Sequence, residues 1–160
     1  MDAPDIKAPP SPERQIQIAL WVLLLAGLAY GLYRAIDLAW VGDDAFISFR
    51  YAKNLIEGHG LVFNVGERVE GYTNFLWTMA IAAGMWLGFD PVPLSIVLGI
   101  ASYVVVIAAY FALSLRLWED EQYGTRVMIP LTVLGLLVHR DMHIYATSGL
   151  ETSALTALIG

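Results

Sequence analysis

The sequence predicts an all-α fold of several transmembrane helices, and two observations lead to that prediction. First, 58% of the 160 residues are hydrophobic and only 15% are charged, whereas a soluble domain has about a quarter of its residues charged. Second, the apolar residues lie in long blocks, and the mean hydropathy is +0.60. A bilayer is the natural solvent for blocks of this kind.

The charge and residue types exclude several function classes. The net charge is −6, and the nine basic residues are scattered singly, so no patch could bind a phosphate backbone and we expect no nucleic-acid partner. The chain has no cysteine, which excludes disulfides and thiolate metal sites. Its three histidines are too dispersed to predict a zinc site.

The first and last segments of the chain differ from the rest. Residues 1–13 are predicted to be a disordered cytoplasmic tail, because four prolines oppose a regular helix there. The tail carries no net positive charge, so it is not a signal peptide. Residues 14–160 are predicted to be an incomplete transmembrane domain, since the final apolar run is too short to cross a bilayer. We therefore expect the chain to be the N-terminal part of a longer protein.

Within that domain we expect transmembrane helices separated by two polar loops. The complete spans are predicted at 16–36, 94–117 and 126–139, with a truncated span from 152. The first loop covers 37–93 and holds two helices that lie on the membrane surface, 44–57 and 74–89. The second loop covers 140–151.

The segment 74–89 decides the predicted topology. It is short for a span and is followed by Asp90-Pro91. If it lies on the surface, Glu151 faces the same extracytoplasmic side as Asp43. The same arrangement puts Arg116 and Arg126 in the cytoplasm, as the positive-inside rule prefers.

The surface helix 44–57 is predicted from its amphipathic pattern. At about 100° per residue, one side is apolar and the other is polar. The apolar stripe consists of Ala45, Phe49, Ala52 and Ile56. The polar side includes Arg50, Lys53, Asn54 and Glu57.

Two adjacent aspartates, Asp43 and Asp44, stand just before this helix, and two interpretations of them stay open. One of them could cap the helix at the positive end of its dipole. Alternatively, one is a general base and the other is a metal ligand or a substrate anchor. Arg50 lies two turns later on nearly the same face. It could pair with Asp43, hold an anionic leaving group or remain a solvated charge.

Other polar residues of the two loops have both structural and functional interpretations. Tyr72 could belong to an aromatic belt at the membrane interface, and His59 between two glycines is typical of an exposed loop. Glu151 could cap the last helix. It gains functional interest only if it faces the same compartment as the two aspartates.

The two loops also resemble those of a known family. The stretch GDDAFISFRYAKNLIEGHGLVFNVGERVEGYTNFLW is similar to the first extracytoplasmic loop of bacterial GT-C glycosyltransferases, and it is closest to the arabinofuranosyltransferase-like members. The later stretch HIYATSGLETSALTAL resembles their second conserved loop. Together the two stretches cover about a third of the chain.

The resemblance implies an enzyme of the bacterial cytoplasmic (inner) membrane. Its donor would be a sugar linked to polyprenyl phosphate, and its acceptor would be a hydroxyl of a glycan, lipid or protein on the extracytoplasmic side. Asp43 and Asp44 would be catalytic, with Asp43 as the base, and Arg50 would contact the phosphate. The further substrate-binding residues would be Tyr51, His59, Glu70, Tyr72, Thr73 and Glu151. The resemblance fixes no cofactor; a divalent metal ion, where one is used, would bind Asp44 and Glu151.

Two rival functions remain at this point. A transporter or channel subunit would need ionisable residues within its spans, and the central spans have none. A non-catalytic membrane scaffold would use the acidic loop to bind a partner. Loss of sugar transfer on replacing the aspartates would distinguish the enzyme from both.

Overall fold

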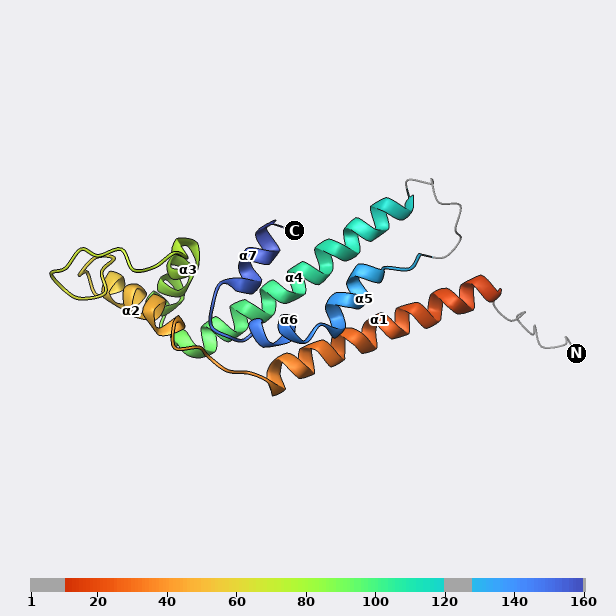
Figure 1. The fold of residues 1–160 in the computed structure, drawn as a ribbon, viewed down its shortest axis with the longest axis horizontal. Helices are drawn as coiled ribbons and strands as arrows, with labels where there is room; N and C mark the ends of the chain where they lie inside the picture. The colour runs from red at the N-terminus through yellow and green to blue at the C-terminus, as the bar shows by residue number, and fades with distance from the viewer. Residues whose placement is uncertain (1–10, 120–127, 160) are drawn as a thin grey trace, which may run out of the picture.

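The computed structural model describes residues 11–119 and 128–159, and within them every regular element is a helix (Figure 1). This confirms the all-α prediction for the described residues. The helices are α1 (Pro12–Asp37), α2 (Ala45–Ile56), α3 (Phe75–Trp86), α4 (Pro91–Glu119), α5 (Leu131–Val138), α6 (Arg140–Tyr145) and α7 (Thr152–Ile159).

Among the described residues, α1 and α4 are long and apolar enough to cross a membrane. Their 26 and 29 residues correspond to about 39 and 43 Å, against roughly 30 Å of hydrocarbon core. Only 11% and 22% of their most apolar windows are buried, whereas the core helices of a soluble protein are mostly buried. Their exposed apolar side chains suit contact with lipid. The two helices run in opposite directions, so α1 ends and α4 begins at the same end of the molecule (Figure 1).

The start of α1 differs from the prediction of a disordered tail over 1–13. Residues 1–10 lie outside the described residues, but Pro12 is already the first residue of the helix. Proline is tolerated there because the first amides of a helix have no partner within it. Ser11 is the N-cap residue, and its hydroxyl accepts a hydrogen bond from the Arg14 amide at 3.4 Å. The helix therefore begins earlier than its prolines suggested.

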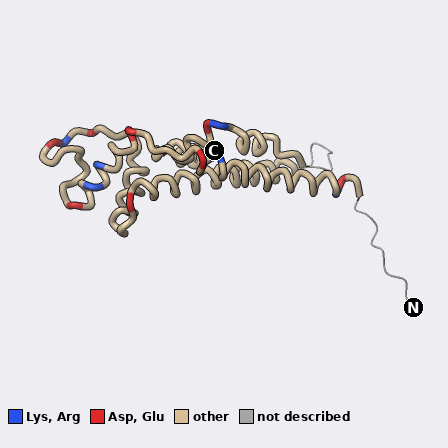
Figure 2. The backbone as a smooth tube through the Cα atoms, turned by 90° about the horizontal axis from the view of Figure 1, so that it is seen from below, with Lys and Arg blue, Asp and Glu red and all other residues tan. Residues whose placement is uncertain are grey.

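The helices α2 and α3 pack together in a lobe, which we define as residues 38–90, at the shared end of α1 and α4 (Figure 1). Figure 2 shows acidic and basic residues gathered on this lobe, whereas long stretches of the helices beside it carry none. The lobe has its own apolar core, formed by Ala45, Phe49, Ala52, Trp77, Ile81 and Ala82.

The predicted faces of α2 are correct except near its end. Ile56, expected in the apolar stripe, is exposed, and Asn54, expected on the polar side, is buried. Burial of Asn54 is tolerated because its amide nitrogen donates to the carbonyls of Val62 and Phe63, at 2.7 and 2.9 Å.

The helix expected at 126–139 is shorter than predicted. Residues 126 and 127, including Arg126, lie outside the described residues, and α5 begins only at Leu131, after Pro130. The backbone is extended at His139, and α6 then occupies part of the expected polar loop.

Ala146, just after α6, touches α4, and α7 packs on α4. A Cβ atom on Gly99 of α4 would come within 2.1 Å of the Ala146 carbonyl oxygen, so these two backbones touch. Close approach at a small residue is the usual way for membrane helices to pack. α7 then runs beside α4 (Figure 1). Because α4 begins at the lobe, these contacts hold the segment between α6 and α7 near the lobe.

Candidate functional site

Asp43 and Asp44 form the turn that leads into α2. The turn is closed by two backbone hydrogen bonds, from the Ala45 amide to the Gly42 carbonyl at 3.0 Å and from the Phe46 amide to the Asp43 carbonyl at 3.1 Å. Asp44 occupies the N-cap position, but its side chain makes no capping hydrogen bond. Both side chains are exposed, and within the described residues neither carboxylate has a partner. Neither carboxylate therefore caps α2 through a hydrogen bond; both stand at the positive end of its dipole and are exposed to a ligand.

The second predicted loop lies directly against this turn. The Gly42 amide donates to the Ser148 carbonyl at 2.9 Å, and the Trp77 indole donates to the Gly149 carbonyl at 3.0 Å. A Cβ atom on Gly149 would come within 2.9 Å of side chains of Val41 and Ala45. We call these contacts the loop junction. It brings the backbone that carries Glu151 to the backbone that carries the aspartates.

Glu151 is held by a polar network that sequence reasoning missed. One Glu151 carboxylate oxygen accepts a hydrogen bond from the Asn74 amide nitrogen at 2.8 Å, across 77 residues of sequence. The same nitrogen lies 3.0 Å from the Ser48 hydroxyl, and the Thr78 hydroxyl donates to the Asn74 amide oxygen at 3.1 Å. Ser48 and Thr78 are buried, whereas Asn74 and Glu151 are half-buried. The only signal in the sequence was an amide side chain just before the apolar segment that becomes α3.

Asn74 and Glu151 also line a groove of about 480 Å³ between α3, α4 and α7. Its walls are mostly apolar. Its polar lining residues are Thr73, Asn74, Ser102 and Glu151. Thr73, predicted from the family resemblance to bind substrate, therefore shares a cavity with Glu151.

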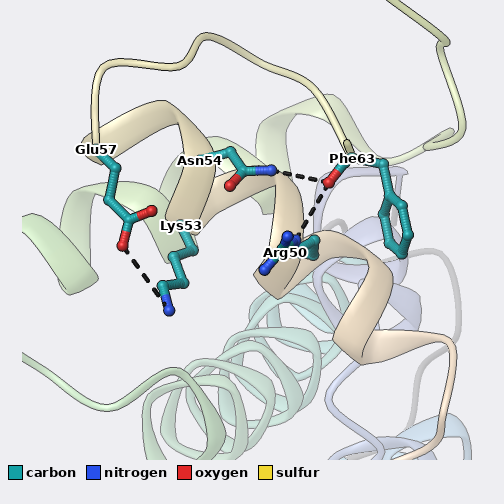
Figure 3. Close-up of polar contacts among 5 residues, drawn as sticks. All are labelled: Arg50, Lys53, Asn54, Glu57 and Phe63. Carbon is teal, nitrogen blue, oxygen red and sulfur yellow. Dashed lines mark hydrogen bonds and ion pairs between the residues drawn. The ribbon is translucent and has the colours of Figure 1, made fainter. Parts of the chain in front are cut away.

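Three side chains of α2 hold the chain segment that returns from α2 to α3. The Arg50 Nε atom donates to the Phe63 carbonyl at 3.2 Å, beside the bond from Asn54 to the same oxygen (Figure 3). The Tyr51 hydroxyl donates to the Val69 carbonyl at 2.7 Å and accepts from the Gly71 amide at 2.9 Å. These bonds give an exposed loop a fixed shape.

Arg50 and Tyr51 differ in their exposure to solvent and in the partners of their polar atoms. Arg50 is exposed; within the described residues it makes no ion pair with Asp43, and its terminal guanidinium nitrogens have no partner. Tyr51 is only 1% exposed, and both hydrogen bonds of its hydroxyl go to backbone. Arg50 is thus accessible to a ligand, whereas Tyr51 acts on the loop.

His59, Glu70 and Tyr72 line a separate hollow of about 410 Å³ in the returning segment. His59 is exposed between Gly58 and Gly60, whose φ angles of 83° and 85° form the sharp turn after α2. The hollow extends along α2: His59 follows the C-terminal end of the helix, whereas the Tyr72 ring packs edge-on against the Tyr51 ring in the middle of the helix, with ring centroids 4.7 Å apart. The structure thus brings these three predicted residues together beside the second half of α2, whereas Asp43 and Asp44 precede its first residue.

Within the described residues, no three or more aspartate, glutamate and histidine side chains gather at one place where they could hold a metal ion. Asp44 and Glu151 alone would leave most of the coordination shell to water or substrate.

Comparisons with known proteins identify two relatives of this chain. It is 32% identical over 149 residues to a Mycobacterium tuberculosis protein described as a terminal β-(1→2)-arabinofuranosyltransferase, a match that covers 91% of this chain and 24% of that protein. It is 34% identical over 112 residues to a Corynebacterium glutamicum protein of the same description, covering 70% of this chain and 16% of that protein. The chain thus spans a quarter or less of the length of these relatives. No family model matches it, and no solved structure matches it.

Proposed function

We propose that this chain, a homologue of terminal β-(1→2)-arabinofuranosyltransferases over most of its length, is part of a membrane glycosyltransferase. The homology supports the transfer of a sugar to a glycan acceptor. The two long apolar helices support a membrane location. The single observation that carries the proposal is the loop junction, which joins three carboxylate-bearing positions at one end of those helices.

The donor that we propose is a sugar linked to polyprenyl phosphate, used by an enzyme of the GT-C type. A lipid-linked donor keeps its head group at the membrane surface, and the paired aspartates stand at the end of the long apolar helices. We propose further that this end faces the extracytoplasmic side of the inner membrane. The acceptor hydroxyl would then approach from the aqueous side.

Sugar transfer from a phosphate requires a base for the acceptor and stabilisation of the departing negative charge. In our proposal the Asp43 carboxylate takes the proton of the acceptor hydroxyl as its oxygen bonds to the anomeric carbon. The bond between that carbon and the phosphate oxygen breaks, and the lipid phosphate leaves with the electron pair. Arg50, exposed with free terminal nitrogens and two helical turns from Asp43, would stabilise the phosphate. Asp44 and Glu151 would hold the acceptor.

The remaining predicted residues receive two different roles. His59, Glu70 and Tyr72 would contact parts of the acceptor away from the reacting hydroxyl, because their hollow lies beside the second half of α2 and the aspartates precede its first residue. Thr73 would contact substrate in the groove. Tyr51, predicted from the family resemblance to bind substrate, would contribute by holding the loop.

The test is Asp43→Asn in the full-length enzyme, reconstituted in membranes with a polyprenyl-phosphate sugar and an acceptor glycan. We expect sugar transfer to fall by roughly 100-fold or more, as general-base catalysis contributes about 10²–10⁴-fold. Glu57→Gln is the matched control, because Glu57 is an exposed carboxylate at the other end of α2 and should leave the rate unchanged. Full activity of Asp43→Asn would remove Asp43 as the base. A wild-type protein that transfers no sugar but binds a partner through this loop would favour the scaffold.

A further inference from the structure

We infer that Asn74 is a positioning residue, whose side-chain amide fixes the Glu151 carboxylate so that its free oxygen is presented to an acceptor hydroxyl in the groove. The inference rests on the proposed function, which makes Glu151 an acceptor contact. It adds a residue to which nothing in the sequence pattern gave a role.

The Asn74 side-chain amide is fixed through both its nitrogen and its oxygen. Its nitrogen faces Glu151 at 2.8 Å, and its oxygen accepts from Thr78 at 3.1 Å. The Ser48 hydroxyl lies within 3.1 Å of both amide atoms. The reversed amide would place oxygen against a carboxylate oxygen, which is repulsive, so Glu151 itself selects the orientation shown.

The two carboxylate oxygens of Glu151 have different surroundings. One accepts the bond from Asn74, and within the described residues the other has no hydrogen-bond or ion-pair partner. A half-buried carboxylate loses hydration, which costs free energy unless new partners replace the water. A purely structural contact with Asn74 would be made equally well by a neutral side chain at position 151. A charged group with one anchored oxygen and one free oxygen is suited to binding a ligand.

The charge of Glu151 indicates which ligand it binds. An ionised carboxylate only accepts hydrogen bonds, so its free oxygen matches a hydroxyl donor and repels a phosphate. Asn74 and Thr73 add polar groups beside it, while most of the groove wall is apolar. This end of the groove therefore favours the neutral, hydroxyl-bearing acceptor over the anionic head of the donor. Through the loop junction, that acceptor would lie beside the aspartates.

The test measures steady-state kinetics of the full-length enzyme with Asn74→Ala, Glu151→Gln and both together. A hydrogen bond to a charged group contributes about 1.5–3 kcal/mol, which corresponds to a change of roughly 10- to 150-fold in kcat/KM. We expect kcat/KM for the acceptor to fall by about that factor in Asn74→Ala, with the KM for the donor unchanged. The double variant should be no worse than Glu151→Gln alone, because residues that act as one unit are not additive. Thr156→Val on α7, which removes a hydroxyl bonded only to the Thr152 carbonyl, should have no effect.

Equal losses for donor and acceptor, or additive losses in the double variant, would overturn the inference, because a merely structural role predicts them. A second measurement does not depend on sugar transfer. Hydrogen–deuterium exchange should speed up around residues 148–152 in Asn74→Ala and stay unchanged in Thr156→Val. Unchanged exchange there would also overturn the inference. A wild-type enzyme without transferase activity contradicts the proposed function instead, and the exchange result still decides whether Asn74 holds Glu151.

Discussion

Asn54 lies in α2 and Asp44 at its N-cap position, and their surroundings are opposite. Asn54 is 2% exposed, and the carbonyls of the returning segment satisfy its amide. Asp44 is exposed at the helix start and has no side-chain hydrogen bond there. A polar side chain on a helix is thus structural when the rest of the chain supplies its partners. It is available for function when the chain leaves it without them.

Tyr51 is a polar side chain of the structural kind, because the chain supplies both partners of its hydroxyl. Tyr51→Phe keeps the ring in place but leaves the Val69 carbonyl and the Gly71 amide without their shared partner. We expect the loop to be destabilised by about 1–3 kcal/mol. Hydrogen–deuterium exchange of residues 60–71 should therefore be faster, and the KM for a long acceptor should rise while that for a short one stays the same.

Tyr33→Phe is the control for this change, because Tyr33 is 62% exposed and lies on α1, outside the lobe. If Tyr51→Phe left the loop exchange as slow as in the wild type, the hydroxyl would not be what holds the loop.

At the scale of elements, the short helix α3 depends on its neighbours. Its 12 residues measure about 18 Å, well below the thickness of a hydrocarbon core. One of its faces makes the tertiary contacts: Trp77 and Ile81 are buried in the lobe core, and the Trp77 indole donates to Gly149. A helix of this length gains its stability from such packing rather than from its own propensity.

The loop junction predicts that Gly149 cannot be replaced. Its φ of 79° lies in the left-handed region, and a Cβ atom would clash with Val41 and Ala45. We expect Gly149→Ala to destabilise the full-length protein by about 2 kcal/mol or more and to lower transferase activity, because Glu151 moves away from the aspartates. Thermal unfolding in detergent and the transfer assay would measure both effects.

Gly135→Ala is the matched control. A Cβ atom on Gly135 of α5 would meet nothing within 4 Å, and alanine is the better helix former by about 1 kcal/mol. This variant should be neutral or slightly more stable. Equal tolerance of alanine at both positions would mean that the junction does not require close backbone contact.

At the scale of the whole molecule, the position of the lobe follows from the direction of the two long helices. α1 ends and α4 begins at the same end, and the lobe lies between those ends (Figure 1). The charged residues gathered on it (Figure 2) would be costly within hydrocarbon. This arrangement favours α1 and α4 as the spans and α3 as a surface helix.

The topology prediction can be tested with reporter fusions in cells. A reporter joined after Asp90, before α4, should be extracytoplasmic, and one joined after Gln122, beyond α4, should be cytoplasmic. The reason is that α4 alone would cross the membrane between the two positions. A cytoplasmic reporter after Asp90, or an extracytoplasmic one after Gln122, would contradict the arrangement.

The sequence by itself determined the all-α class, the two long apolar helices and the apolar face of most of α2. These features depend on the hydropathy and spacing of residues close together in the chain. It also indicated the family, through motifs in two loops. The precise ends of the helices were less predictable, because Pro12 and Pro130 start helices rather than only interrupting them.

Only the tertiary structure decided which of the polar residues meet. Asn74 and Glu151 are 77 residues apart, and no local pattern encodes a contact over that distance. The structure also showed Tyr51 buried as a loop anchor and His59 at the far end of α2 from the aspartates. The physical reason is that a hydrogen bond depends on the final positions of two groups, whereas periodicity reports only which face of one helix is apolar.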